Sequence, residues 1–112
     1  MKDDQVYLSH ILDAITRIES YTLKGKEYFF RESMVQDAVI RNLEVIGEAV
    51  KSLSADLRAR HPDIPWTRIV GMRDVLIHQY FGVRLQTVWN AVENRLPELK
   101  QHIKSLLGDE VK

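Results

Sequence analysis

Residues 35–53 read VQDAVIRNLEVIGEAVKSL, and this stretch carries the most regular pattern in the chain. Its apolar residues return at steps of three and four, the spacing that places them on one face of an α-helix. The six residues of this stripe are Val35, Val39, Leu43, Ile46, Val50 and Leu53. Gly47 lies inside the stripe, where glycine costs a helix about 1 kcal/mol relative to alanine. We therefore predict a long helix, with a close approach of another helix or backbone at Gly47.

Helical spacing is also present on the N-terminal side of this stretch. The apolar stripe there consists of Leu8, Ile11, Ile15 and Ile18. It predicts a helix that opens with Asp3 or Asp4 as its capping residue and ends near Tyr21. Residues 22–26 contain a glycine and form a connector, from which the aromatic residues 28–30 lead into the longer pattern.

Prolines mark the segment that follows. Residues 54–65, SADLRARHPDIP, predict a short helical turn and then a loop, because residues that precede proline avoid the helical conformation. Pro65 suits the first turn of a further helix over about residues 66–80, since its missing N–H is harmless there. Gly82 is well placed to end that helix.

A last helical pattern covers residues 85–106, and we expect Pro97 to kink or split it. The chain shows no strand-like alternation of useful length, no internal repeat and no linker long enough to separate domains. We therefore expect residues 1–112 to form one all-α domain, folded as an antiparallel four- or five-helix bundle.

The composition is that of an ordinary globular protein, with 45% hydrophobic and 29% charged residues. The absence of cysteine excludes a thiolate nucleophile and a cysteine-based zinc site, and it suits a reducing compartment. No run approaches the roughly 18 apolar residues that a membrane span needs, and the N-terminus lacks the apolar stretch of a signal peptide. We expect a cytoplasmic protein that does not bind a membrane.

Charge bears on the kind of partner. Sixteen Lys and Arg residues balance sixteen Asp and Glu residues, so the chain lacks the positive field of a general nucleic-acid binder. The one basic concentration consists of Arg58, Arg60, His61, Arg68 and Arg73, and acidic residues dilute it. By itself it indicates a solvated face. Any contact with RNA must be local, and Arg60 and Arg68 are our candidates for it.

Several kinds of chemistry have no motif in the chain. The four histidines lack the spacing of a metal site, and no HExxH sequence, glycine-rich phosphate loop or nucleophilic serine motif occurs. We therefore expect neither a metal nor a cofactor. What remains is RDVLIHQY, residues 73–80, which places a fixed cation, a carboxylate, an imidazole and a phenol within eight residues. An Arg followed five positions later by His is a weak signal on its own.

Four parts of the chain together resemble the HepT-like branch of the HEPN superfamily. They are RNLEVIGEA at 41–49, HPDIPW at 61–66, GMRDVLIHQYFGV at 71–83, and VWNAV with LPEL at 88–99. The distinctive element of that family is Arg-x4-His-x-Tyr, which Arg73, His78 and Tyr80 match, and Asp74 matches the polar residue after the Arg. Gln79 stands where many relatives have glycine, which leaves the motif residues in place.

The resemblance implies a dimeric helical bundle and a metal-independent endoribonuclease that cleaves RNA such as mRNA or tRNA. It also implies a toxin, neutralised by an antitoxin of the minimal nucleotidyltransferase type (MntA). That partner would transfer AMP from ATP onto Tyr80, which lies seven positions after Arg73 and so within about 20° of it on a continuous helix.

The residue types at 73–78 suit metal-free RNA cleavage, which needs a base, an acid and a cation for the phosphorane. His78 can take either proton role, and the planar fork of Arg73 matches phosphate oxygens. Asp74 would orient one of these groups or merely balance charge. Positions five apart on a helix diverge by about 140°, so Arg73 and His78 of one chain do not converge on one phosphate. A two-fold axis would bring two copies of each around one cleft, and we therefore expect a homodimer.

A different class of function stays open, namely a non-catalytic helical partner or substrate-binding subunit of a nucleotidyltransferase. Such a module needs no His paired with Arg, whereas a ribonuclease needs both, so the motif favours the ribonuclease. Without the resemblance, His78 would be read as a packing or capping residue and Arg73 as a surface or interface cation. Trp66 and Trp89 lie on apolar stripes, and we expect them to anchor the core rather than to stack on bases.

Overall fold

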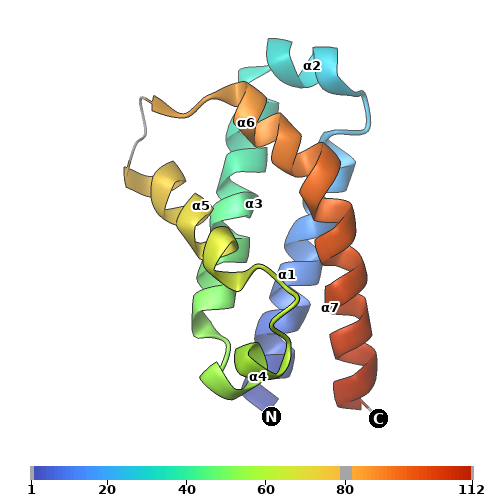
Figure 1. Ribbon diagram of the computed structural model, residues 1–112. Helices are drawn as coiled ribbons and strands as arrows, with labels where there is room; N and C mark the ends of the chain where they lie inside the picture. The colour runs from blue at the N-terminus through green and yellow to red at the C-terminus, as the bar shows by residue number, and fades with distance from the viewer. Residues whose placement is uncertain (1, 79–81, 112) are drawn as a thin grey trace.

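Three long helices run along the main axis of the protein. The computed structural model describes residues 2–78 and 82–111, and every regular element in those ranges is helical. The long helices are α1 (Lys2–Tyr21), α3 (Ser33–Ser52) and α7 (Leu96–Val111). They lie along the 43 Å dimension of a molecule that measures 43 × 27 × 20 Å, and α1 runs antiparallel to the other two (Figure 1). The prediction of an all-α protein is confirmed.

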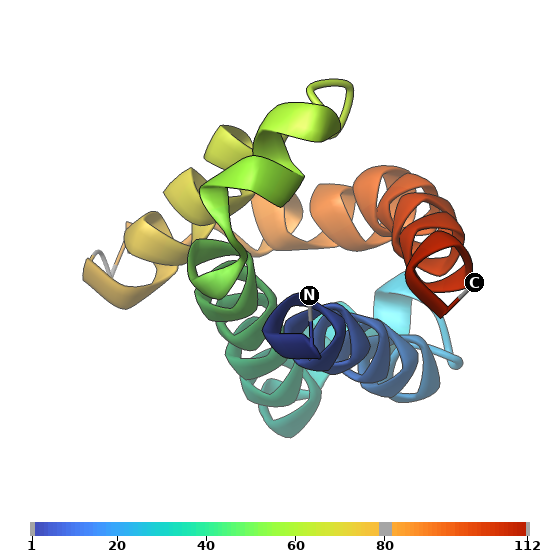
Figure 2. The ribbon, with the colours of Figure 1, turned by 90° about the horizontal axis from the view of Figure 1, so that it is seen from below.

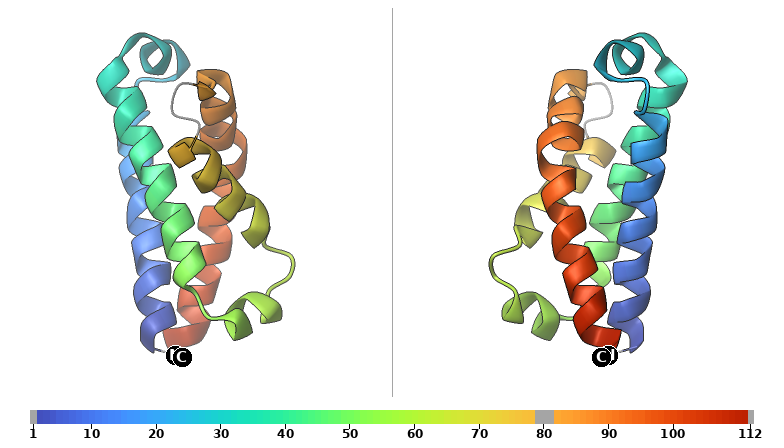
Figure 3. Two further views of the ribbon diagram at one scale, coloured as in Figure 1. Left: turned by 90° about the vertical axis from the view of Figure 1, so that its left-hand side faces the viewer. Right: turned by 90° about the vertical axis from the view of Figure 1, so that its right-hand side faces the viewer.

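The remaining helices are shorter and cover the ends and one side of the long ones. They are α2 (Lys26–Arg31), α4 (Ala55–Arg60), α5 (Trp66–His78) and α6 (Leu85–Asn90). Seen along the main axis, α1 lies between α3 and α7, and α5 lies on the outer side of α3 (Figure 2). The side views show α5 crossing α3 obliquely, with α2 and α4 at opposite ends of the molecule (Figure 3).

The aromatic segment 28–30 forms a helix of its own instead of merging with the helix that follows. Glu32 takes an extended conformation (φ −107°, ψ 107°) and separates α2 from α3. The side chain of Gln36 then donates to the carbonyl oxygens of Phe29 (3.0 Å) and Phe30 (3.2 Å). These bonds satisfy carbonyls that the end of a helix leaves without a partner.

The core forms where the predicted apolar stripes meet. Its fully buried members include Leu8, Ile11, Ile15 and Ile18 of α1, Val39 and Val50 of α3, Val88 of α6 and Ile103 of α7. Trp66 and Trp89 are buried as well, and the ring of Trp89 lies 5.3 Å from that of Phe29. The prediction that both tryptophans anchor the core is confirmed.

The helical run from Leu85 to Val111 widens into a π turn, η2 (Ala91–Arg95), just before Pro97. There the N–H of Leu96 donates to the carbonyl of Ala91, five residues back. Proline has no N–H, and its ring presses on the carbonyl four residues earlier in an α-helix, so a wider turn relieves the conflict. Pro97 is expected to kink or split this helix, and what the structure shows is this π turn, with the helical run continuing through the proline.

One predicted helix cap is wrong. Because α1 begins at Lys2, neither Asp3 nor Asp4 stands at its cap position. Asp4 is buried instead and accepts hydrogen bonds from the N–H (2.8 Å) and the hydroxyl (2.7 Å) of Ser54. The same hydroxyl accepts from the N–H of Leu57 (3.1 Å) and thereby caps α4. This chain of bonds ties the start of α1 to the start of α4.

Within the described ranges, none of the helices combines the length and the apolar character that crossing a membrane would require.

Candidate active site

The site is built where α5 crosses α3. At this crossing Gly47 of α3 faces the side chain of Arg73, and a Cβ added to Gly47 would overlap the Cβ of Arg73 and lie 2.8 Å from its Cγ. Only glycine leaves room for that aliphatic stem. The predicted close approach at Gly47 is confirmed, and it fixes the position from which Arg73 extends.

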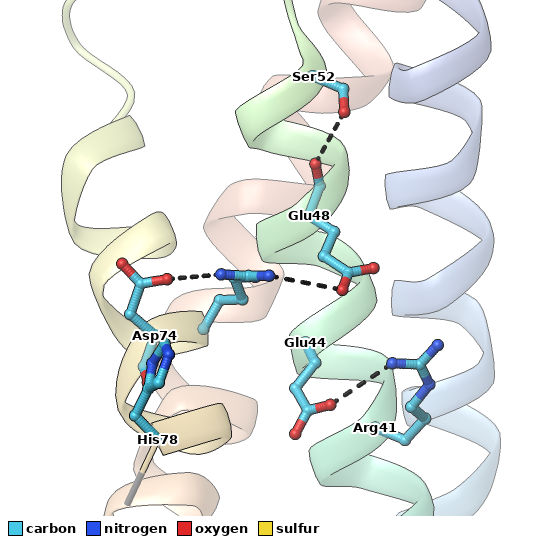
Figure 4. A network of polar contacts seen from close by, with 7 residues as sticks. Arg41, Glu44, Glu48, Ser52, Asp74 and His78 are labelled. Atoms are coloured by element: carbon cyan, nitrogen blue, oxygen red, sulfur yellow. Dashed lines mark hydrogen bonds and ion pairs between the residues drawn. The ribbon is translucent and has the colours of Figure 1, made fainter.

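The guanidinium of Arg73 lies between two carboxylates that come from different helices (Figure 4). Its Nη1 donates to Oδ1 of Asp74 at 2.7 Å, and its Nη2 lies 3.7 Å from Oε1 of Glu48. Its Nε is buried without a hydrogen-bond partner in the described part of the protein. The Arg73 side chain is only 18% exposed, and because its Nε is buried a ligand could meet only the terminal part of the guanidinium.

Asp74 is held in its charged form by this neighbour. The hydrogen bond from Arg73 is the main cause that lowers the pKa of Asp74 below its ordinary value of 3.8, against a smaller opposing effect of desolvation. The positive charges of Arg73, Lys51 and His78 lower the pKa further. Asp74 therefore carries a full negative charge at neutral pH.

His78 lies at the last described turn of α5, with its side chain exposed. Its Nδ1 is 2.9 Å from the backbone carbonyl oxygen of Asp74. A carbonyl oxygen can only accept a hydrogen bond, so Nδ1 carries the proton. In the neutral ring Nε2 is then the free base, and in the charged ring it is a donor. Asp74 thus serves both neighbours, since its side chain holds Arg73 and its backbone orients His78.

Not every predicted site residue joins this cluster. No hydrogen bond or ion pair links Arg73 to His78, both of which are described, in keeping with their predicted divergence around the helix. Arg60 lies on α4, where its Nε donates to Asp56 at 3.1 Å. Tyr80 lies outside the described residues. In the ranges that the structure covers, no group of three or more His, Asp or Glu side chains is arranged to hold a metal ion.

A groove of about 970 Å³ runs beside the crossing, between α5 and the segment formed by η2 and α7. Its apolar wall on α5 is made by Ile69, Met72 and Val75, and the predicted RNA contact Arg68 lines it too. Val75 is 45% exposed and Ile77 is 36% exposed, and because they are two positions apart they flank the Asp74–His78 face of α5 on opposite sides.

Glu48 and Lys51 are members of the site that the sequence did not reveal. Both belong to α3, and they meet Arg73 and Asp74 only because α5 folds back across that helix. No rule of local spacing connects residues on two helices. The one available signal was Gly47, which predicts a close approach and directly precedes Glu48.

The chain is similar to known proteins over most of its length. A family described as "Ribonuclease HepT-like" matches residues 11–106. A protein of Caldanaerobacter subterraneus subsp. tengcongensis named "Putative RNase" is 40% identical over 114 residues, which cover 98% of this chain and 99% of that protein. The "Probable ribonuclease HepT" of Thermococcus cleftensis is 44% identical over 101 residues, which cover 89% and 92%.

A third relative is a longer protein. The "Gamma-glutamylcyclotransferase and putative RNase" of Methanocaldococcus jannaschii is 45% identical over 109 residues, which cover 96% of this chain. They cover 49% of the relative, so the chain spans about half of its length. No match to a solved structure was found.

Proposed function

Because the chain belongs to the HepT-like ribonuclease family, we propose that it is a metal-independent endoribonuclease whose active site contains Arg73, Asp74 and His78. The observation that carries this proposal is the double role of Asp74. Its carboxylate holds the guanidinium of Arg73, and its carbonyl leaves Nε2 of His78 free for proton transfer. A cation and a proton carrier are the groups that RNA cleavage without a metal needs.

In the proposed reaction the 2′-hydroxyl of the RNA attacks the adjacent phosphorus. Nε2 of one neutral His78 takes the proton of that hydroxyl. Arg73 stabilises the negative charge that gathers on the phosphorane oxygens. The bond to the 5′-oxygen then breaks, and a second, protonated imidazole gives its proton to that oxygen. The products are a 2′,3′-cyclic phosphate and a free 5′-hydroxyl.

The second imidazole would come from a second copy of the chain. Arg73 and His78 of one copy do not touch, whereas a two-fold axis beside α5 would place two of each around one cleft. The exposed Val75 and Ile77 and the apolar wall of the groove give α5 a surface that a second copy could cover. These features support a homodimer whose copies share one site. The proposed substrate is RNA such as mRNA or tRNA.

We further propose that the protein is a cytoplasmic toxin, held inactive by an MntA-type nucleotidyltransferase that attaches AMP to Tyr80. Tyr80 follows His78 by two residues, so a nucleotide on its hydroxyl would bring a phosphate and a base close to the catalytic histidine. Such a group imitates RNA and excludes it by bulk and negative charge.

Cleavage of total RNA by the purified protein in the presence of EDTA tests the proposed activity. We expect the parent to cut, and His78→Ala and Arg73→Ala each to lower the rate by about 100-fold or more. His10→Ala and Arg17→Ala remove exposed residues of the same types from α1 and should cut at the parent rate. A parent protein that cuts only with a divalent metal, or not at all, would overturn the proposal. In the second case a non-catalytic subunit of a nucleotidyltransferase would be the better interpretation.

Mass spectrometry after co-expression with the nucleotidyltransferase tests the modification. We expect AMP on the parent and none on Tyr80→Phe, which keeps the ring but lacks the acceptor oxygen. Tyr28→Phe is the matched control and should be modified like the parent. AMP found on Tyr7, Tyr21 or Tyr28 would contradict the proposed target, as would complete silencing of an active Tyr80→Phe variant.

A further inference from the structure

The cation that should receive the RNA phosphate is already occupied. Both terminal nitrogens of Arg73 face carboxylates, and its remaining nitrogen is buried. Two negative charges therefore surround one positive charge at the point where a phosphate would bind. A phosphodiester that approaches this guanidinium meets repulsion as well as attraction, so one carboxylate has to give way.

The two carboxylates hold Arg73 unequally. Asp74 accepts a hydrogen bond of 2.7 Å, the length of a strong bond between charged groups. Glu48 lies at 3.7 Å, which is close enough for an ion pair but too long for a hydrogen bond. Exposure does not distinguish them, because the side chains of Glu48 and Asp74 are 47% and 48% exposed, so the weaker contact decides. Glu48 is therefore the partner that leaves at the lower cost.

The rest of Arg73 is held in a way that would keep the guanidinium in place when Glu48 leaves. Its stem lies against Gly47, and Asp74 retains the other terminal nitrogen. Only the Nη2 side of the fork would open, and it would open toward the surface where Glu48 lies. The positive charge of Lys51, three residues further along α3, acts on the same site.

We propose that Glu48 occupies the phosphate-binding side of Arg73 in the free protein and is displaced by a phosphate of the RNA backbone. This inference rests on the proposed ribonuclease function and deepens it. Glu48 is then a residue that sets the affinity for RNA, because every bound RNA has to break the ion pair between Glu48 and Arg73.

Binding of an RNA that cannot be cut provides the test. A fluorescein-labelled 2′-O-methyl oligonucleotide lacks the attacking hydroxyl, so fluorescence anisotropy in EDTA reports its Kd alone. Glu48→Gln keeps the size of the side chain and removes its charge, and we expect its Kd to fall roughly two- to fivefold, the range of a part-exposed ion pair. Asp74→Asn should bind more weakly than the parent, because it loosens the hold on Arg73.

Glu44→Gln is the matched control. Glu44 lies one turn before Glu48 on α3 and pairs with Arg41 at 3.5 Å, so this variant removes the same charge without a contact to Arg73 (Figure 4). Its Kd should change much less than that of Glu48→Gln. An equal fall in both variants would show a general charge effect and overturn the proposal, and so would an unchanged or higher Kd for Glu48→Gln.

Cleavage of the unmodified oligonucleotide separates this inference from the proposed function. A parent that binds the 2′-O-methyl RNA but cuts no unmodified RNA overturns the ribonuclease, while the comparison of Kd values still tests Glu48. If Glu48→Gln lowers kcat tenfold or more and leaves Kd unchanged, Glu48 takes part in the chemistry and displacement is overturned. Glu48→Ala repeats the test if the Gln variant fails to fold by circular dichroism.

Discussion

Gly47 shows how a residue without a side chain places a charge. The stem of Arg73 lies against the α-carbon of Gly47, and the guanidinium is thereby held beside α3 instead of extending into solvent. Burial of the charge is tolerated because carboxylates flank it on two sides. One glycine thus determines the position of the arginine on which phosphate binding would depend.

Gly47→Ala should therefore impair activity more than it impairs folding. The added methyl group would force Arg73 to move, which typically costs about 1–3 kcal/mol, against a gain of about 1 kcal/mol in helix propensity. We expect a modest loss of unfolding free energy in urea and a fall in RNA cleavage of at least about tenfold, because precise placement of a charged group is worth this much. Gly108→Ala is the control, since a Cβ there meets nothing within 4 Å. Cleavage by Gly47→Ala at the parent rate would contradict this role.

The Arg73–Asp74 pair predicts a particular pH dependence. Because the pKa of Asp74 is lowered in the folded protein, the pair contributes stability above pH 3.8 and loses it as the pH falls through the lowered value. The difference in unfolding free energy between the parent and Asp74→Asn should accordingly be constant at neutral pH and vanish in acid. Carboxyl ¹³C NMR should give a midpoint for Asp74 below 3.8 in the parent and a higher one in Arg73→Gln. If the midpoint of Asp74 is the same in Arg73→Gln as in the parent, Arg73 is not the cause of the lowered pKa.

Sequence alone could propose those candidate site residues that share one helix. Arg73, Asp74 and His78 lie on α5 within six positions, and the expected divergence of Arg73 from His78 agrees with their separate partners. Glu48 could not be identified in this way, because its proximity to Arg73 depends on the angle at which α5 crosses α3. That angle follows from packing around Gly47 and from the loop at residues 61–65, neither of which has a periodic signal.

At the level of helices, periodicity located the long ones and missed one of the breaks between them. The helices α1 and α3 follow from steps of three and four, and Pro97 marks the region where the last helix departs from regular α geometry. The break at Glu32 has no glycine or proline to mark it. It is stabilised by a hydrogen bond from the Gln36 side chain of α3 to the carbonyl of Phe29 in α2. The local sequence predicts a cap at Asp4 because it does not show that the partner of Asp4 is Ser54, fifty residues away.

Ser54 joins two helices, and its removal should cost more than the loss of an ordinary cap. Ser54→Ala deletes the cap of α4 and takes one hydrogen-bond donor from the buried Asp4. We expect the unfolding free energy in urea to fall by about 1–3 kcal/mol. Ser52→Ala is the control, because its hydroxyl donates only to the carbonyl of Glu48 within α3.

A double-mutant cycle checks that the cost of Ser54→Ala comes from Asp4. The double variant Asp4→Ala/Ser54→Ala should lose less unfolding free energy than the two single variants together, by about 0.5–3 kcal/mol. Strict additivity would mean that the bond between Asp4 and Ser54 contributes nothing to stability.

At the scale of the whole molecule, the proposed dimer determines how many histidines each cleavage event requires. If two copies share one cleft and each supplies one proton carrier, a dimer with a single His78 is inactive. If each copy works alone, such a dimer keeps half of its activity. The two arrangements therefore differ in how activity falls when inactive chains are added.

Mixing subunits distinguishes them. Equal amounts of parent and His78→Ala chains are unfolded together and refolded. The mixture should keep about one quarter of the activity of an equal total amount of pure parent protein, because only dimers of two parent chains cleave. Independent sites would leave about one half. A mixture with His10→Ala chains should keep full activity and controls for losses during refolding.

The π turn ahead of Pro97 allows this part of the chain to lose a residue without turning α7. The turn absorbs one residue more than an α-helical turn, so α6 and α7 face the directions they would have in a regular helix one residue shorter. Deletion of the exposed Glu93 should therefore leave α7 in place, with Lys100 paired with Glu19 of α1 and Ile103 in the core. Its cost should be limited to that of a proline in a regular helix. Deletion of Gln101, inside α7, has no wider turn to absorb it and would rotate Ile103 out of the core by about 100°.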